Sequence, residues 1–360
     1  MTIYGIGELW GSMTMWPKEV RNDLRQGLRE SMREERGIAV QYLTRAWETA
    51  KKMKLEEFGL QPYMKTTGIA ITLAAVLEAD SKHERAYQVY QEALSQLQEG
   101  AGDSTSRLRT GLSAPERMRG VALAYRLGEL AEQLHKPAEE EEKWLVHSVE
   151  TTLRDIMHAS PKKDVSIERA MPEGKVEASG MVEHLKLPMW ATSHDLAAPF
   201  EALGSFYSKT GKVSYAMPLY LQAISILIPP PPQVTSADDQ CRAAQLMGNI
   251  AELILRTSMD SASVEQAESW ANKGLEVASR VRKSTFRTHP VCEHAYAMML
   301  YNLAMIRDMS GDQDRARQLF VESMHQARSI GLKEAVKNAE KAIGELGRGA
   351  EVPSVLTKNK

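Results

Sequence analysis

Cysteine is almost absent from this chain of 360 residues, in which only Cys241 and Cys292 occur. Two cysteines do not make a disulfide framework, so we expect each to be a small thiol that is buried or half-buried. Cysteine usage therefore leaves the redox state of the compartment open.

Long apolar runs are also lacking. The longest candidates, "IAITLAAVL" at 69–77 and "AYAMMLYNLAMI" at 295–306, are much shorter than the ~20 residues that cross a bilayer. The N-terminus, "MTIYGIGELWGSMTMW", has neither the basic start nor the apolar centre of a signal peptide. We therefore expect a soluble polypeptide whose membrane anchor, if it has one, lies upstream of this chain.

The chain has no excess of charge of either sign. Its 45 Lys and Arg residues nearly balance its 47 Asp and Glu residues, which gives a net charge of −2. No general field therefore attracts nucleic acid or acidic lipid, and we expect no nucleic-acid partner.

Catalytic and metal-binding patterns are missing too. His289, Cys292 and His294 lie close together in "HPVCEH", but a metal site needs about four ligands and no second cluster completes one. The carboxylates of "KPAEEEEKW" (136–144) are interpreted as a solvated helix face. The glycine-rich stretches lack the context of a phosphate loop, and no serine lies in an elbow motif. We therefore expect no enzyme, no cofactor and no metal ion.

What the sequence has instead is a characteristic spacing. In "LGSFYSKTGKVSYAMPLYLQAI", the small residue Gly204 is followed by Ala216, Tyr220 and Ala223. Small residues in two helices let the helices approach closely, an aromatic side chain fills the space beside them, and Gly211 turns the chain. The spacing therefore predicts a helical hairpin.

The same spacing recurs at five other small residues, which we call anchors. Gly27 is followed by Ala39, Leu43 and Ala46; Ala74 by Ala86, Tyr90 and Ala93; and Ala304 by Ala316, Phe320 and Ser323. Gly128 gives Glu140, Trp144 and His147, which keeps only the aromatic residue; Gly248 fits if the turn is lengthened by seven residues, giving Ala267, Ala271 and Gly274. One hairpin cannot bury its apolar face, so we predict a stack of hairpins that share a core.

The pattern resembles the tetratricopeptide repeat (TPR). This resemblance implies an all-α, TPR-like solenoid of helical hairpins, wound as a right-handed superhelix, with about six irregular repeats and a C-terminal capping helix. The expected units lie near 20–53, 67–100, 121–154, 197–230, 241–281 and 297–330, with a loop insertion at 155–195, the capping helix at 331–347 and a flexible tail at 348–360. The segment 1–19 precedes the first unit, and its Trp10, Met13, Met15 and Trp16 dock either on a partner or on the first helix.

A helical solenoid offers a binding surface. The first helices of stacked hairpins line a concave groove that can hold an extended segment or a helix. Helical spacing from the anchors gives the candidate groove residues: Arg25, Leu28, Ile71, Ala75, Tyr125, Glu129, Glu201, Ser205, Arg242, Gln245, Asn249, Tyr301 and Met305. Their chemistry is mixed, so we predict no clamp for a chaperone's C-terminal carboxylate. The 19 methionines suit repacking around varied partners, although core filling accounts for most of them.

Two longer stretches, "WPKEVRNDLRQGLRESMREERGIAVQYLTRAWETA" (16–50) and "KTTGIAITLAAVLE" (65–78), resemble the fungal mitochondrial TPR adaptor of the i-AAA protease of the inner membrane. The resemblance implies a domain in the intermembrane space, tethered by an upstream membrane helix that this chain lacks. It implies a non-enzymatic role in which unfolded or membrane-protein substrates are recruited to the i-AAA protease, together with a companion adaptor subunit. The alternative is a mitochondrial TPR assembly factor for a respiratory complex, which would have one stable folded partner.

Overall fold

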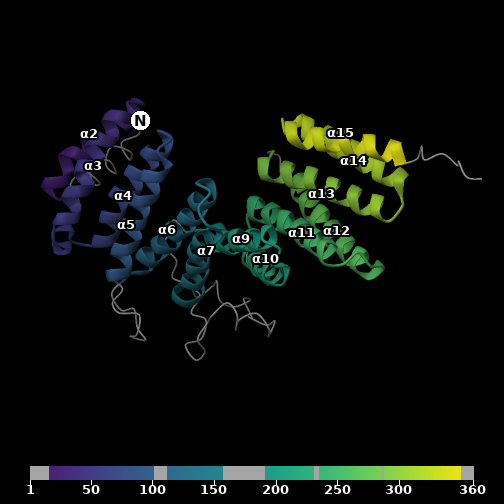
Figure 1. The fold of residues 1–360 in the computed structure, drawn as a ribbon, viewed down its shortest axis with the longest axis horizontal. Helices are drawn as coiled ribbons and strands as arrows, with labels where there is room; N and C mark the ends of the chain where they lie inside the picture. Colours follow the sequence, from purple (N-terminus) through teal and green to yellow (C-terminus); the bar gives the residue numbers. More distant parts are fainter. Residues whose placement is uncertain (1–15, 101–111, 157–190, 231–234, 285–287, 350–360) are drawn as a thin grey trace, which may run out of the picture. The chain divides into compact units, whose positions relative to one another are not determined.

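The computed structural model describes residues 16–100, 112–156, 191–230, 235–284 and 288–349. Within these ranges the chain is all-α: thirteen α-helices pack in sequence as six hairpins and a last single helix, which is a TPR-like repeat fold (Figure 1). The helices belong to two compact units. Unit 1 runs from α2 to η2, and unit 2 runs from α9 to α15.

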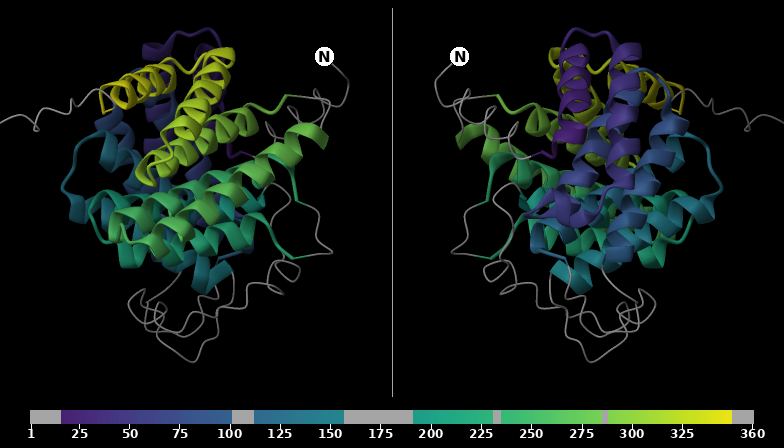
Figure 2. Two further views of the ribbon diagram at one scale, coloured as in Figure 1. Left: turned by 90° about the vertical axis from the view of Figure 1, so that its right-hand side faces the viewer. Right: turned by 90° about the vertical axis from the view of Figure 1, so that its left-hand side faces the viewer.

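In each unit, every helix packs against the next one along the chain. Unit 1 contains α2 (Lys18–Met32), α3 (Arg36–Lys52), the 3-10 helix η1 (Leu55–Phe58), α4 (Pro62–Ala79), α5 (His83–Gly100), α6 (Ala114–Gln133), α7 (Ala138–Thr151) and the π-helical turn η2 (Thr152–Ile156). Unit 2 contains α9 (Ser193–Lys209), α10 (Val213–Leu227), α11 (Ala237–Thr257), α12 (Ser261–Ser284), α13 (Pro290–Met309), α14 (Gln313–Ser329) and α15 (Lys333–Gly349). Figure 2 shows the α13–α15 end of unit 2 and the α2–α3 end of unit 1.

Five of the connections that the structure describes between helices use one kind of turn. Its central residue has a left-handed conformation and lies two positions before the next helix: Glu34, Ser81, Gly211, Gly311 and Gly331. The next residue donates its backbone N–H to a carbonyl five residues back, as Lys212 does to Tyr207 at 2.8 Å and Asp312 to Arg307 at 2.9 Å. This arrangement is the Schellman motif, which satisfies the carbonyls at a helix end. The predicted turn glycines, Gly211 (φ 77°) and Gly311 (φ 83°), have this conformation.

The small anchors lie where paired helices touch. A Cβ atom on Gly27 would come within 2.6 Å of the Leu43 side chain, and one on Gly204 within 2.8 Å of the Tyr220 ring. The alanines of the repeating pattern are fully buried: Ala39, Ala46, Ala74, Ala86, Ala93, Ala216, Ala223, Ala304 and Ala316. The close approach that the spacing predicts is therefore present in the regular hairpins.

The hairpin that starts at Gly128 is more regular than the sequence predicts. The expected equivalents of its second helix were Glu140, Trp144 and His147. The turn 134–137 has one residue more than the turns of the other hairpins, and its left-handed residue, His135, lies three positions before α7. The register therefore moves by one: a Cβ atom on Gly128 would meet Leu145 at 2.5 Å, and the fully buried Ser148 takes the last small position.

The hairpin that starts at Gly248 also differs from the prediction. Its turn is not lengthened, because α11 ends at Thr257 and α12 begins at Ser261. The additional residues instead extend the two helices, which have 21 and 24 residues. Gly274 keeps the helices close, since its Cβ atom would lie 3.0 Å from the carbonyl oxygen of Ala244.

The two cysteines form a disulfide, so the expectation of two separate thiols is wrong. Cys241 in α11 and Cys292 in α13 have Cα atoms 4.9 Å apart and are 0% and 1% exposed. The bond joins the first helices of two successive hairpins and lies in a cluster with Ala244, Ala278 and Ala295. The cysteines are 51 positions apart in the sequence, and they meet because α11 and α13 pack against each other.

The chain ends and the longest insertion fall largely outside the described residues. The predicted capping helix is α15, shifted by two residues to Lys333–Gly349. Trp16 packs against the core of unit 1, and its ring lies 3.8 Å from the position of a Cβ atom on Gly68 of α4. Trp10, Met13 and Met15, most of the insertion 155–195 and most of the tail 348–360 lie outside the description. No described helix is long and apolar enough to span a bilayer.

Candidate protein-binding face

The thirteen candidate groove residues lie on the first helices of the hairpins, and none of them is fully buried. Most of them lie three positions before or one position after an anchor. The two candidates beside one anchor, such as Glu201 and Ser205 beside Gly204, are therefore one turn apart on the same helix face. We call this set the open face. Unit 1 contributes six of the residues (Arg25, Leu28, Ile71, Ala75, Tyr125 and Glu129), and unit 2 contributes the other seven.

The open face of unit 1 holds a charged network whose members satisfy one another. The Tyr125 hydroxyl donates to Glu129 Oε1 at 2.8 Å, and Arg126 donates to Glu129 Oε2 at 2.6 Å and to Glu78 of α4. The Tyr90 hydroxyl donates to Glu78 at 2.8 Å. Burial acts to lower the pKa of Arg126, but hydrogen bonds and charge attraction to the two glutamates raise it overall. This network ties α4, α5 and α6 together.

The open face of unit 2 begins at α9 and α11. Glu201 and Arg242 form an ion pair at 3.8 Å. Burial raises the pKa of Glu201, and the positive charge of Arg242 opposes that rise. The side chains of Ser205 and Asn249 lie at the hydroxyl of Tyr220, whose pKa burial raises to about 12. The structure therefore brings together predicted residues of two first helices.

The face continues from α11 to α13. Gln245 Nε2 lies 3.0 Å from His294 Nδ1. In the sequence, His294 is considered only as part of a possible metal cluster. It lies seven positions before Tyr301, however, and therefore on the same helix face. Cys292 cannot act as a thiolate ligand for a metal ion because its sulfur is bonded to Cys241. His289 Nδ1 lies 3.2 Å from Asp238 Oδ1. In the described parts of the chain, no three His, Cys, Asp or Glu side chains are grouped to hold a metal ion.

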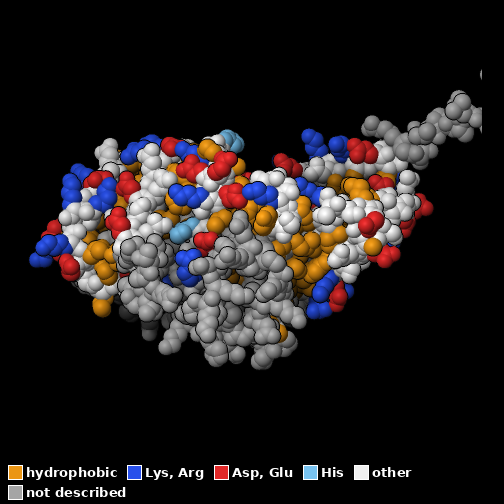
Figure 3. All heavy atoms as spheres, turned by 60° about the horizontal axis from the view of Figure 1, so that its bottom comes forward, with side chains coloured by type: hydrophobic (Ala, Val, Ile, Leu, Met, Phe, Trp, Pro, Cys, Tyr) orange, Lys and Arg blue, Asp and Glu red, His pale blue; other side chains and the backbone are white. Residues whose placement is uncertain are grey.

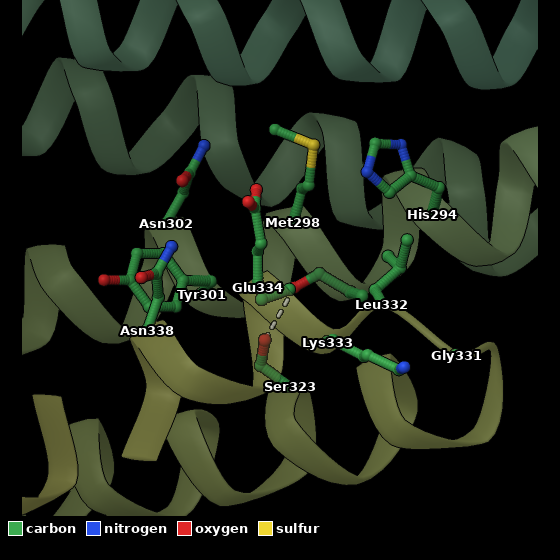
Figure 4. A pocket seen from close by; sticks show the side chains of 12 residues that line it. His294, Met298, Tyr301, Asn302, Ser323, Gly331, Leu332, Lys333, Glu334 and Asn338 are labelled. Carbon is green, nitrogen blue, oxygen red and sulfur yellow. Dashed lines mark hydrogen bonds between the residues drawn. The ribbon is translucent and has the colours of Figure 1, made fainter. Parts of the chain in front are cut away.

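A cavity of about 590 Å³ opens at the far end of this face, between α13, α14 and α15 (Figure 4). It is lined by His294, Ala297, Met298, Tyr301, Asn302, Ser323, Gly331, Leu332, Lys333, Glu334, Ala335 and Asn338. Of the candidate groove residues only Tyr301 lines it, and Met305, one turn further along α13, is 38% exposed. The contribution of α15 is not evident from the sequence, because the pattern of 331–347 indicates only a capping helix.

The surface charges are mixed, as the composition predicts. On the side of the molecule drawn in Figure 3, Lys and Arg side chains are interspersed with Asp and Glu side chains. The acidic run of 136–144 lies largely in the first turn of α7, where carboxylates interact favourably with the helix N-terminus. Glu140 accepts a hydrogen bond from Tyr87 at 2.7 Å, so this part of the run stabilises the hairpin stack.

Comparison of the sequence with family models and with curated proteins gave no match. Among solved structures, the chain is similar to BtubC (BKLC) from P. vanneervenii, with a TM-score of 0.52 and 14% identity over 81% of this chain and 91% of that chain. It also matches the S. pombe nuclear import adaptor Nro1 (TM-score 0.47, 11% identity, 89% and 97% covered). A third match is a putative kinesin light chain from Podosopora anserina with nearly identical TPR-like repeats (TM-score 0.46, 12% identity, 75% and 98% covered). By fold, this chain is a TPR-like helical repeat protein.

Proposed function

We propose that this chain is a non-enzymatic adaptor that binds other polypeptides through the open face of unit 2. The observation that carries this proposal is the row of partly exposed side chains from α9 through α11 to α13, which leads to the cavity beside α15. Stacked helical hairpins characteristically present such a face to a peptide.

The chemistry of the face favours binding that is weak and broad. Gln245, Asn249 and Asn302 carry carboxamides, which both donate and accept hydrogen bonds and so suit any peptide main chain. Met298 and Met305 are flexible and polarizable, and they adapt to different apolar side chains. The expected partners are therefore unfolded polypeptide segments.

The finer part of the proposal is that the chain recruits unfolded or membrane-protein substrates to the i-AAA protease of the mitochondrial inner membrane. It rests on the resemblance of 16–50 and 65–78 to the adaptor of that protease. It puts the chain in the intermembrane space with a companion adaptor subunit, and on the membrane only through an anchor outside this chain. The disulfide between Cys241 and Cys292 supports a compartment in which disulfides persist.

One observation favours the alternative of an assembly factor for a respiratory complex. The network of Glu78, Arg126 and Glu129 makes part of the open face of unit 1 polar and internally paired. Such a surface suits one folded partner better than many unfolded segments.

Site-specific crosslinking in mitochondria tests both readings. Benzoylphenylalanine replaces Gln245 on the open face or, as a matched control, the exposed Lys273 on α12. The proposal predicts crosslinks to protease subunits and unfolded substrates from the first position and not from the second. A single respiratory subunit crosslinked from position 245 would establish the alternative, and equal products from both positions would contradict binding at the open face.

A further inference from the structure

We propose that the cavity between α13, α14 and α15 is an anchor site for an uncharged, extended peptide: it takes one apolar side chain, while Asn302 and Asn338 hold the main chain of the peptide. This inference rests on the proposed function and adds the chemical class of the segment that is bound.

The floor of the cavity requires no polar group from a ligand. The Ser323 hydroxyl donates to the carbonyl oxygen of Ala297 at 2.9 Å, so the polar groups at this point already satisfy each other. Met298, Leu332 and Ala335 add carbon and sulfur atoms to the lining. A charged or unpaired polar group placed on this floor would lose its hydration without gaining a partner. An apolar side chain is therefore the favoured occupant.

The walls are held in place before a ligand arrives. The Tyr301 ring packs edge-on against Phe320, with ring centroids 5.3 Å apart. His294 is paired with Gln245 at 3.0 Å. A preformed wall reduces the entropy that binding must cost, whereas the flexible Met298 lets the cavity accept side chains of different shape.

Two carboxamides from different helices supply main-chain hydrogen bonds. In Figure 4, Asn302 of α13 and Asn338 of α15 lie at the same end of the cavity as Tyr301, whereas His294 and Leu332 lie at the other end. Neither carboxamide has a hydrogen-bond partner among the residues that the structure describes. Each offers a donor and an acceptor, as the N–H and C=O groups of an extended strand require.

The charge and size of the cavity agree with this occupant. Lys333 and Glu334 both line the cavity, so its formal charges cancel. In Figure 4 the Glu334 carboxylate points toward Met298 and Asn302, whereas the Lys333 side chain points away from them. The carboxylate disfavours an acidic segment, and the absence of a net charge gives a basic segment no general attraction. The volume of about 590 Å³ lies within the range of sites that enclose most of a ligand. It leaves room for a side chain and for the main chain that flanks it.

The test uses the full chain and labelled host peptides. Each peptide consists of Ser, Asn, Gln and Gly around one central guest residue: Leu, Met, Phe, Ser, Asp or Lys. Burial of a large apolar side chain is expected to make the peptides with Leu, Met and Phe bind about tenfold or more tightly than the peptide with Ser. The peptides with Asp and Lys should bind no more tightly than the peptide with Ser. Fluorescence anisotropy measures the affinities.

Two matched variants locate the effect. Ala335→Phe fills the cavity from the first turn of α15, where Ala335 is only partly buried. Ala262→Phe places the same side chain at an exposed position in the first turn of α12. The first variant should abolish the preference for Leu over Ser, and the second should keep it within about twofold. Thermal unfolding followed by circular dichroism checks that both variants fold.

A benzoylphenylalanine guest gives a second measurement that needs no variant. Its crosslinks should fall on Met298 and on 331–338. Crosslinks confined to α9 and α11, or a folded Ala335→Phe variant that still prefers Leu, would overturn the anchor site and leave the proposed function standing. A preference for Asp or Lys would also overturn the anchor site. The absence of saturable binding by any peptide would contradict both proposals.

Discussion

The disulfide between Cys241 and Cys292 should contribute a large share of the stability of unit 2. The perturbation is the double replacement Cys241→Ala with Cys292→Ala, and reduction of the unchanged protein provides a second version. The two cysteines are 51 positions apart. For a closed loop of that length, the restriction of the unfolded chain corresponds to about 4 kcal/mol at 25 °C.

Hydrogen exchange read by mass spectrometry measures this change helix by helix. Loss of about 4 kcal/mol corresponds to a fall in amide protection of about a thousandfold in α11, α12 and α13. The core helices α3 and α4 belong to the other compact unit, so their protection should not change. Reduction and replacement should agree, because both act through the same bond.

Two results would refute this reasoning. A loss of less than about 1 kcal/mol in α11–α13 would mean that the bond does not restrict the unfolded chain as its loop length requires. An equal loss of protection in α3 and α4 would mean that the two units unfold as one body, against their division into separate cores.

Three further predictions follow from packing, turn conformation and burial. Gly204→Ala should destabilise unit 2 by about 1–3 kcal/mol, because the added Cβ atom would lie 2.8 Å from the Tyr220 ring. Gly37→Ala has open space around it and should stabilise the protein slightly. Thermal unfolding measures both changes. Gly311→Ala should cost about 1–2 kcal/mol because φ is 83°, and Gly344→Ala, inside α15, should not; a smaller cost at 311 than at 344 would reject the turn argument. Burial raises the pKa of Tyr220 from 10.0 to about 12. The unfolded state therefore loses the proton first, and the free energy of unfolding falls as the pH rises between these values. Urea titrations should show a shallower fall with pH for Tyr220→Phe, and the same pH dependence in both proteins would contradict the shift.

The helical hairpins could be predicted from the sequence because close helix contacts leave a mark on spacing. Gly204 and Tyr220 are sixteen positions apart in the sequence and touch in the structure, as Gly27 and Leu43 do. The open-face positions follow from the same anchors, since residues one turn apart share a helix face. A local rule was sufficient for these features.

The features that could not be predicted from the sequence depend on turn length and on contacts between different helices. A single additional residue in the turn 134–137 moves the register of α7, and the spacing alone does not show where it is inserted. The pairing of Cys241 with Cys292 requires α11 and α13 to be neighbours, which only the folded stack establishes. The ion pairs of Arg126 with Glu78 and Glu129 likewise depend on which of the many acidic side chains lie beside it in the folded stack.

The cavity beside α15 was missed for a related reason. A capping helix was expected to cover the last hairpin, and the amphipathic pattern of 331–347 agrees with that role. The first turns of α15, however, line a cavity together with Met298 and Asn302 of α13 instead of covering them. How much of the last hairpin a capping helix covers depends on where the helices pack against each other, and the periodicity of the sequence does not determine that position.

The most direct test of the account is a methyl NMR titration with the Leu host peptide, using protein labelled at the methionine methyl groups. Binding in the cavity beside α15, at the end of the open face of unit 2, predicts a large shift for Met298 and a smaller one for Met305. It predicts no shift for Met118, which is 1% exposed in unit 1, or for Met259, which is 73% exposed in the turn between α11 and α12. A shift at Met259 with none at Met298 would contradict the account.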